Sequence, residues 1–260
     1  MKKTLLATKD GELLEKLIAK YGKVVTASQI QAEARHNWSY QETKNRIQML
    51  AKNGWLIRIK RGLYAISDLS SLGFLSVSPY VIANLLVKES YISFEAALSH
   101  RGMFDQFTDQ LISVSLKQFK ATNLNAIHYR FIKTQNKMYT GWETVEIENM
   151  TAQIAFAEKA LVDMIHFRKR KYVVDLVIEK LQDYDRDLDT DQLYNYISMA
   201  SQKTIKIFGL VFDMLGIDSD LLYQLVLGSN STHRMSPEDK TFNAKWRLYY
   251  DDYFEKYRRK

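Results

Sequence analysis

The sequence contains no cysteine, and it has only 2 prolines and 10 glycines in 260 residues. Without cysteine, disulfide bonds, thiolate catalysis and cysteine-based zinc sites are all excluded. The scarcity of proline and glycine indicates long regular elements, mostly helices, rather than a loop-rich or low-complexity chain. A chain without disulfides also fits a reducing compartment.

Long apolar runs are missing as well. The start, MKKTLLATKD, resembles a signal peptide only briefly, because its apolar run Leu5–Ala7 is far shorter than an h-region of ~7–15 residues. No window reaches the roughly 18 continuous apolar residues that a membrane span needs. We therefore expect a soluble, cytoplasmic protein with no membrane partner.

Positive charge is concentrated in the first quarter of the chain. Residues 1–66 hold 13 Lys and Arg against 5 Asp and Glu, a balance of +8. Residues 67–260 hold 24 against 25, a balance of −1. A basic segment attached to a neutral body predicts contact with a polyanion at one end of the protein. Chance surface composition is the alternative explanation.

Three helices are predicted in this basic segment. The first covers Asp10–Tyr21, and the second begins near Thr26 or Ser28 after a short extended piece. The third begins after a capping box, Ser39 with Glu42, and ends at Asn53-Gly54. Its inward face is expected to consist of Tyr40, Thr43, Ile47 and Leu50.

A basic hairpin is predicted after the third helix. Residues 55–60 alternate in polarity as a strand does, Arg61-Gly62 supplies a turn, and Leu63–Ile66 returns as a second strand. Helix, helix, helix and basic hairpin is the order of a winged helix-turn-helix. We therefore predict a DNA-binding domain over residues 1–68, although a hairpin that merely closes a small domain has the same sequence pattern.

The candidate DNA contacts lie on the outer face of the third helix and in the hairpin. Glutamine and asparagine amides both donate and accept hydrogen bonds at base edges, whereas cations contact phosphates. A solvated polar face would have a similar composition. The predicted contacts are Gln41, Lys44, Asn45, Arg46, Gln48 and Lys52 on the helix, and Arg58, Lys60 and Arg61 in the hairpin.

Residues 69–260 are predicted to form a larger C-terminal domain with a small sheet and a helical bundle, which makes the protein α+β but mainly helical. A connector, residues 67–79, leads to a helix that begins at Pro79 and runs through Val87. Strands are expected at 111–119, 126–133 and 142–149, and only helices after them. The first of these helices is expected over Gln153–Phe167.

No enzymatic signature is found. The alternating aspartates of 183–191 lack the glycine and glutamate of a calcium loop, since Leu188 and Tyr194 occupy those positions. Helix-capping aspartates explain this run better. The histidines show no metal-ligand spacing, and neither a phosphate loop nor a nucleophile elbow is present. We expect no catalytic residue, no metal and no cofactor.

Two further basic clusters allow more than one interpretation. RKRKY, residues 168–172, follows a helix and can stabilise its C-terminus, or it can form a second nucleic-acid contact. In the tail, Trp246, Tyr250, Tyr253 and Tyr257 form one helical stripe. The stripe predicts a helix docked on the body, with a dimer contact or a stacking platform for single strands as alternatives.

Five segments, in the order KRGLYAI, YISFEAALSHRGM, ISVSLKQF, AIHYRFIK and AEKALVDMI, resemble the AbiE-type antitoxins. These are bacterial transcriptional regulators of type IV toxin–antitoxin (abortive phage infection) systems. The resemblance extends from about Asp10 to Phe167, and it lies in the order and spacing of short, mainly structural motifs. Arg61, Gly62 and Tyr64 match the family's hairpin motif, and the EKAL helix, residues 158–161, has a structural role.

The resemblance implies a winged-helix domain that binds inverted repeats in its own promoter and represses the antitoxin–toxin operon. It also implies a C-terminal domain with the antitoxin activity, and a nucleotidyltransferase-like toxin as functional partner without a stable complex. The tail after Gly228 matches the family least. A stand-alone winged-helix regulator without a toxin is one alternative. A nucleic-acid-processing enzyme is a weaker one.

Overall fold

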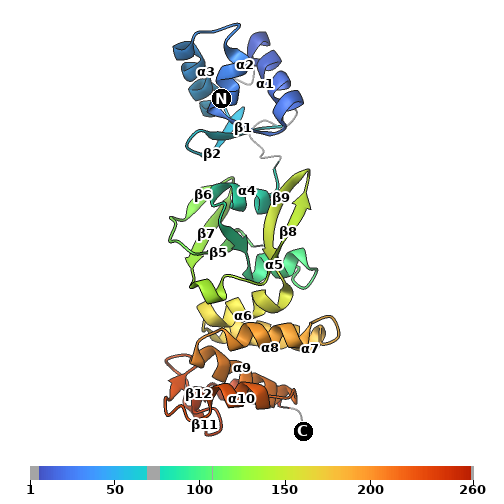
Figure 1. Cartoon of the computed structure of the whole chain (residues 1–260), viewed down its shortest axis with the longest axis vertical. Helices are drawn as coiled ribbons and strands as arrows, with labels where there is room; N and C mark the ends of the chain where they lie inside the picture. Colours follow the sequence, from blue (N-terminus) through green and yellow to red (C-terminus); the bar gives the residue numbers. More distant parts are fainter. Residues whose placement is uncertain (1–5, 69–76, 107, 259–260) are drawn as a thin grey trace.

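The structure, a computed structural model, describes residues 6–68, 77–106 and 108–258. Figure 1 shows an elongated molecule with the N-terminal helices at one end and the C-terminal elements at the other. Residues 6–68 are called the N-terminal module below, and residues 77–258 the body. Most of the predicted connector, residues 69–76, lies outside the described residues. The α+β architecture agrees with the prediction.

The N-terminal module contains three helices and a small antiparallel sheet of order β1–β3–β2. Its helices enclose a hydrophobic cluster that includes Leu14, Leu17, Ile30, Leu50 and Trp55. The three predicted helices and the hairpin are present, and the helices fit a helix-turn-helix-like arrangement. In chain order the elements are α1 (Thr8–Tyr21), β1 (Val24–Thr26), α2 (Ala27–Ala34), α3 (Tyr40–Lys52), β2 (Leu56–Lys60) and β3 (Leu63–Ile66).

A buried carboxylate joins α1 to α2. Glu33 of α2 accepts hydrogen bonds from Lys20 Nζ at 2.7 Å and from the Tyr21 hydroxyl at 2.9 Å. Lys16 Nζ lies 2.9 Å from its other oxygen. The hydrogen bond from Lys20, followed by those from Lys16 and Tyr21, lowers the pKa of Glu33 to about 2. The two helices are therefore held together by charge as well as by apolar contact.

A six-stranded mixed sheet forms the first part of the body. Its order is β6–β7–β5–β4–β9–β8, in which β5 pairs with β7, and β4 with β9, in parallel. The elements are α4 (Pro79–Leu86), β4 (Ser90–Ile92), α5 (Phe94–His100), β5 (Gln110–Ser115), β6 (Thr122–Leu124), β7 (Ile127–Lys133), η1 (Asn136–Met138), β8 (Trp142–Ile147) and β9 (Met150–Ala155). The sheet is larger than predicted, because β4 and β6 are too short to show a period of two.

Helices form most of the second part of the body, which Figure 1 shows below the sheet. The prediction of helices alone is wrong here. Residues 153–155, predicted as the start of a helix, belong to strand β9, and the helix begins at Ala157. A second sheet of the body, of order β10–β12–β11, follows the helices. The elements are α6 (Ala157–Phe167), α7 (Lys171–Asp183), α8 (Thr190–Ser198), α9 (Gln202–Leu215), α10 (Asp220–Val226), β10 (His233–Arg234), β11 (Thr241–Asn243), β12 (Leu248–Tyr250) and η2 (Asp252–Tyr257).

A buried ion pair links α6 to β4 and the residue that follows it. Lys159 and Asp163, one turn apart on α6, form a salt bridge with both side chains almost fully buried. The hydroxyls of Tyr91 and Ser93 donate to Asp163 Oδ2 at 3.1 and 2.8 Å. Burial raises the pKa of Asp163, although Lys159 and the two hydroxyls oppose this effect. The pair fixes α6 against the sheet.

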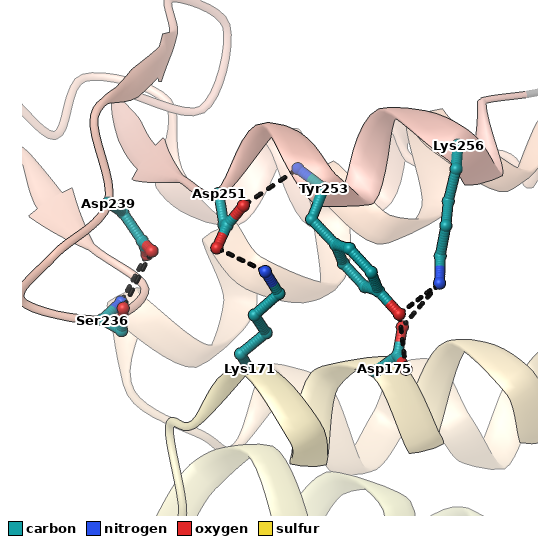
Figure 2. A network of polar contacts seen from close by, with 7 residues as sticks. All are labelled: Lys171, Asp175, Ser236, Asp239, Asp251, Tyr253 and Lys256. Carbon is teal, nitrogen blue, oxygen red and sulfur yellow. Dashed lines mark hydrogen bonds and ion pairs between the residues drawn. The ribbon is translucent and has the colours of Figure 1, made fainter.

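The tail packs on the body, as predicted, but its residues do not form one helix. Trp246 precedes strand β12, and residues 252–257 form a 3₁₀ helix, η2. Pairing of β12 with β10 and β11 overrides the helical stripe. Figure 2 shows the contact with α7: Lys171 pairs with Asp251 at 2.8 Å, and the Tyr253 hydroxyl donates to Asp175 at 3.1 Å.

Trp246 anchors the tail against α9. Its side chain is fully buried, and its Nε1 donates to Asp213 Oδ2 at 2.6 Å. The indole ring lies so close to Gly209 of α9 that a Cβ added at Gly209 would overlap the ring. Burial by itself raises the pKa of Asp213, but hydrogen bonds from Lys245, Ser219 and Trp246 outweigh it and lower that pKa.

Candidate nucleic-acid interface

Helix α3 begins and ends where the sequence predicts. Ser39 Oγ accepts from the Glu42 backbone N–H at 3.4 Å, and Glu42 Oε2 accepts from the Ser39 backbone N–H at 2.8 Å, which completes the capping box. The helix ends before Asn53, and Gly54 follows with φ 86°. These local signals fix the register of α3, and with it the residues that its two faces present.

The buried face of α3 consists of Thr43, Ile47 and Leu50, as predicted. Tyr40 is the exception, since 62% of its side chain is exposed and the prediction that it packs inward is wrong. It is the first residue of α3, and Trp38, two residues before it, packs against the hydrophobic cluster instead. Lys44 Nζ lies over the exposed Tyr40 ring, 4.6 Å from its centroid.

A groove between α3 and the β2–β3 hairpin brings together five of the nine predicted contacts. Gln41, Lys44 and Gln48 come from α3, and Arg58 and Arg61 come from the hairpin. The rest of the lining comes from α2, from the inner side of α3 and from the hairpin. These other lining residues are Ala27, Gln31, Ile47, Gly62 and Tyr64.

The hairpin is positioned by its turn and by a contact with α2. Gly62 has φ 75°, a left-handed conformation that favours glycine, as predicted for the Arg61-Gly62 turn. Its carbonyl accepts from the Ala27 backbone N–H at 2.9 Å, at the start of α2. The strand register shifts between Arg58 and Lys60. Because of this irregularity, Arg58 lines the groove whereas Lys60 does not.

Two of the predicted contacts are held by other parts of the protein. Arg46 Nη1 donates to both carboxylate oxygens of Asp10 at 2.7 and 2.8 Å, and its guanidinium lies 4.2 Å from the Trp38 ring centroid. Asp10 is only 1% exposed, so Arg46 neutralises a buried charge that joins α1 to α3. Lys60 Nζ lies 3.5 Å from the Leu86 carbonyl of the body.

The remaining two predicted contacts lie beside the groove. Asn45 Oδ1 accepts from Gln41 Nε2 at 3.3 Å on the exposed side of α3. Lys52 is exposed in the last turn of the helix and does not line the groove. Both side chains lie on the same helix as the lining amides, so they extend the polar surface of α3 beyond the groove.

The groove has a positive electrostatic character. Within the described parts of the chain, Lys44, Arg58 and Arg61 form no ion pair with a carboxylate. Glu42 lies on the same helix, but its carboxylate is used by the capping box, whose hydrogen bonds from Ser39 lower its pKa. Unpaired cations beside exposed amides can contact phosphates and base edges at once.

Comparison with known families identifies the segment that holds this groove. Residues 12–67 match the model of a family described as transcriptional regulator, AbiEi antitoxin. Residues 12–67 are AbiEi-like. The resemblance to AbiE-type antitoxins is therefore confirmed over this segment, which contains α2, α3 and the hairpin. A comparison with curated proteins finds no match.

A solved structure resembles the whole chain rather than this segment alone. The crystal structure of RV2827C protein from Mycobacterium tuberculosis aligns over 95% of this chain and 92% of that chain, with a TM-score of 0.66. The two sequences are 13% identical. At this identity the likeness concerns the fold alone, which extends from the AbiEi-like segment through the body.

Sequence reasoning misses Gln31, which lines the groove from α2. The signal was indirect: in a helix-turn-helix the helix before α3 runs beside it, so a polar residue on the outer side of α2 faces the same groove. Tyr64 also lines the groove and belongs to the hairpin motif of the AbiE-type antitoxins. Outside the AbiEi-like segment, Asp189 caps α8 by accepting from the Gln192 backbone N–H at 3.0 Å, as predicted for the aspartate run.

The described residues form neither a cluster of metal ligands nor a membrane-spanning helix. No group of three or more His, Asp or Glu side chains is arranged as metal ligands in the part of the chain that the structure describes. In the same residues, no helix is both long enough and apolar enough to cross a membrane. The groove is the surface that collects most of the predicted functional side chains.

Proposed function

We propose that the protein is a sequence-specific DNA-binding transcriptional repressor. In this proposal, residues 1–68 form a winged helix-turn-helix domain and residues 69–260 form a C-terminal domain. The AbiEi-like segment supports this function, because its family is described as transcriptional regulators. The observation that carries the proposal is the groove, in which amides of α3 lie beside hairpin arginines without carboxylate partners.

The proposed binding mode places α3 in the major groove of duplex DNA. Gln41, Asn45 and Gln48 then contact base edges, where an amide can donate and accept together. Lys44, Arg58 and Arg61 contact phosphates, with Lys52 at the end of the helix as a further phosphate contact. Repression needs no chemistry, because a protein bound at a promoter excludes RNA polymerase.

Arg46 and Lys60 have other roles in this proposal. Because Arg46 pairs with the buried Asp10, it holds α3 to α1 rather than contacting a phosphate. Lys60 contacts the Leu86 carbonyl of the body and so helps to hold the hairpin against α4. Fewer cations are therefore available for DNA than the net charge of the module indicates.

The finer proposal concerns the operon. We infer that the protein represses its own type IV toxin–antitoxin operon in the cytoplasm by binding inverted repeats in the promoter. Its C-terminal domain then acts as antitoxin against a nucleotidyltransferase-like toxin, without forming a stable complex. The match of residues 12–67 to the AbiEi antitoxins supports this proposal. Because the match covers only the basic segment, a stand-alone regulator without a toxin is the second candidate.

The DNA-binding proposal is tested by a salt titration of the intact protein. The probe is duplex DNA from upstream of its own gene, with a scrambled duplex of equal length, and binding is followed by fluorescence anisotropy. Arg61→Ala is expected to weaken binding to both duplexes and to reduce the slope of log K against log salt by about one. Gln48→Ala is expected to reduce the preference for the upstream duplex, because it removes a base contact.

Arg35→Ala is the matched control, since Arg35 is an exposed arginine of the same module that does not line the groove. It is expected to bind both duplexes like the wild type, apart from a small general effect of charge. If Arg61→Ala and Gln48→Ala also bind like the wild type at every salt concentration, the assignment of the groove to DNA is wrong.

The operon proposal needs a separate test. An adjacent reading frame for a nucleotidyltransferase-like protein, toxic when expressed alone and harmless when expressed with this protein, would support it. Groove variants such as Arg61→Ala are expected to lose repression but to keep protection, because protection is assigned to residues 69–260. Loss of both activities in a folded groove variant would contradict this division of labour.

A further inference from the structure

A second basic site lies in the body, far from the groove in the fold. A cavity of about 440 Å³ is formed where the end of β7, η1, the end of α6 and the α8–α9 connection meet. Small-molecule sites commonly have volumes of ~300–1,000 Å³. No Asp or Glu is part of its lining. The lining residues are Lys133, Thr134, Gln135, Lys137, Met138, His166, Phe167, Met199, Ala200 and Ser201.

Cations accumulate around this cavity without matching carboxylates. Lys133 and Lys137 line it and are exposed. Lys169 and Lys203 are half-buried and follow the lining residues Phe167 and Ser201 by two positions in the chain. Among the described residues, none of these four lysines forms an ion pair. Burial, followed by the charge of Lys203, lowers the pKa of Lys169. Like charges are therefore held close together here, which is unfavourable unless an anion joins them.

One acidic group that acts on these lysines already has other partners. Asp239 is the carboxylate whose charge acts on Lys203. Its oxygens accept from the Ser236 backbone N–H at 2.5 Å and from the Ser236 hydroxyl at 2.8 Å, a pair that Figure 2 shows. Asp239 is also buried, and its carboxylate is not part of the cavity lining.

The pKa of His166 is affected by the same positive charges. Burial, followed by the charges of Lys169, Lys159 and Lys137, lowers the pKa of His166 to about 4. Its Nδ1 lies 3.2 Å from Thr204 Oγ1 in the first turn of α9. A neutral imidazole at the wall of the cavity can donate to an anion or accept from a ligand hydroxyl.

The N-terminus of α9 adds a favourable site for an anion. This helix has 14 residues, and Ser201, which lines the cavity, is its N-cap. Ser201 Oγ accepts from the Thr204 backbone N–H at 3.4 Å, so the N–H groups of Gln202 and Lys203 are those without an acceptor within the helix. The helix dipole is positive there. Phosphates bind readily at such a position when cations surround it.

An apolar wall completes the site. Phe167, Met138 and Met199 line the cavity beside the lysines. The Phe167 ring contacts Phe94 and His166, which fixes its orientation. A free phosphate would leave this wall unused, whereas a planar base could stack against it. We propose that the cavity binds a nucleotide, with its phosphates at Lys133, Lys137 and the first turn of α9, and its base against Phe167 and Met199.

This proposal is independent of DNA binding and is tested with the intact protein. Pyrophosphate, the four common nucleoside triphosphates and a 12-residue single-stranded oligonucleotide are titrated separately at 150 mM salt by calorimetry. At least one nucleoside triphosphate is expected to bind with a Kd below about 1 mM, and more tightly than pyrophosphate. The oligonucleotide is expected not to compete for the site.

Two pairs of variants locate the site. Lys133→Ala combined with Lys137→Ala is expected to weaken nucleotide binding about tenfold or more, whereas Lys117→Ala with Lys120→Ala, two exposed lysines outside the cavity, is expected to change it less than about twofold. Ser201→Asp retains a good N-cap but adds a negative charge at the cavity, so it should abolish binding. Ser39→Asp makes the same change at the cap of α3 and should not.

A further variant separates the two halves of the site. Met199→Ala is expected to weaken the nucleotide but not pyrophosphate, because it changes only the apolar wall. The proposal is overturned if no nucleotide binds at millimolar concentration, or if the cavity variants and their controls behave alike. It is also overturned if only the oligonucleotide binds and Lys133→Ala with Lys137→Ala abolishes that binding, because the site would then belong to nucleic acid.

Discussion

The groove of the N-terminal module and the buried core of the body use their charged side chains in opposite ways. In the groove of the module, Lys44, Arg58 and Arg61 are exposed, and none of them is paired with a described carboxylate. In the body, Lys159 and Asp163 are buried together and share a hydrogen-bonded network. The first arrangement leaves charge available to a partner. The second uses it to hold elements of the fold together.

The difference shows that partners, rather than charge, decide what a basic residue does. Arg46 and Arg61 are both arginines of the module, but Arg46 has a buried carboxylate beside it and Arg61 does not. Removing a paired, buried charge leaves its partner desolvated and alone, whereas removing an exposed one leaves nothing unsatisfied. Variants at these positions can therefore distinguish the two uses.

Asp163→Ala is expected to have the largest effect. It leaves the Lys159 ammonium buried without a counter-charge, so the free energy of unfolding should fall by about 3–5 kcal/mol. Urea unfolding measures this change. Asp187→Ala, at an exposed aspartate between α7 and α8, is the control and should change it by less than about 0.5 kcal/mol. Equal effects of the two variants would contradict a stabilising role for the buried pair.

His166, which lines the cavity, is expected to make the stability of the protein depend on pH. In the unfolded chain a histidine binds its proton at an ordinary pKa of about 6.5, but the folded state resists protonation until its pKa of about 4. Stability should therefore fall as the pH falls from 6.5 to 4, by roughly 2 kcal/mol after solvent screening.

Urea unfolding between pH 7 and pH 4.5 tests this expectation. His166→Gln cannot titrate, so its stability should fall less steeply with acid than that of the wild type. His36→Gln, at an exposed histidine of the N-terminal module, should keep the wild-type profile. Identical profiles for all three proteins would mean that burial and the nearby lysines do not lower the pKa of His166.

Arg46→Ala is expected to cost about 1.5 kcal/mol of stability, because Asp10 then remains buried without its partner. Unfolding is measured by urea titration, and Lys52→Ala on the exposed side of the same helix is the control. DNA affinity at low temperature should fall less than in Arg61→Ala. A variant of wild-type stability with strongly reduced DNA affinity would return Arg46 to the set of DNA contacts.

Arg58→Ala is expected to have the smallest effect on stability, within about 0.5 kcal/mol, because no described carboxylate depends on it. The same urea titration measures it, and the anisotropy titration should show weaker DNA binding in the same preparation. A loss of more than about 1 kcal/mol would show that the hairpin arginine supports the fold, and the contrast between the two regions would then be weaker.

Local chemistry made part of this fold predictable. The capping box of Ser39 and Glu42, the Arg61-Gly62 turn and the start of α4 at Pro79 each depend on a few neighbouring residues, and each is present. The resemblance to AbiE-type antitoxins was recognisable for a related reason. Its motifs are structural segments in a fixed order.

Long-range pairing made other parts unpredictable. Residues 150–155 pair with β8 and β4 on either side, so a short apolar segment that could have begun a helix is a strand instead. In the tail, the stripe of Trp246, Tyr250, Tyr253 and Tyr257 has the spacing of a helix. Pairing with β10 and β11 makes Leu248–Tyr250 a strand, and no local signal reports those partners.

The candidate site shows the same limit. The outer face of α3 follows from helical spacing, and the hairpin arginines follow from the turn. The partner of Arg46, by contrast, is Asp10, which lies 36 residues away, and the acceptor of Lys60 is a carbonyl 26 residues away. Spacing within one element cannot report such partners. It therefore predicts on which face of an element a cation lies, but not which distant group it contacts.

The contact between Gly209 and Trp246 limits how the protein can be shortened. The Trp246 indole lies directly on the backbone of α9 at Gly209 and so joins this helix to the carboxyl-terminal segment. A protein that ends before Lys245 would have an empty slot the size of that ring halfway along α9. The first turn of the same helix borders the cationic cavity, so trimming the last residues is expected to disturb a surface that they do not touch.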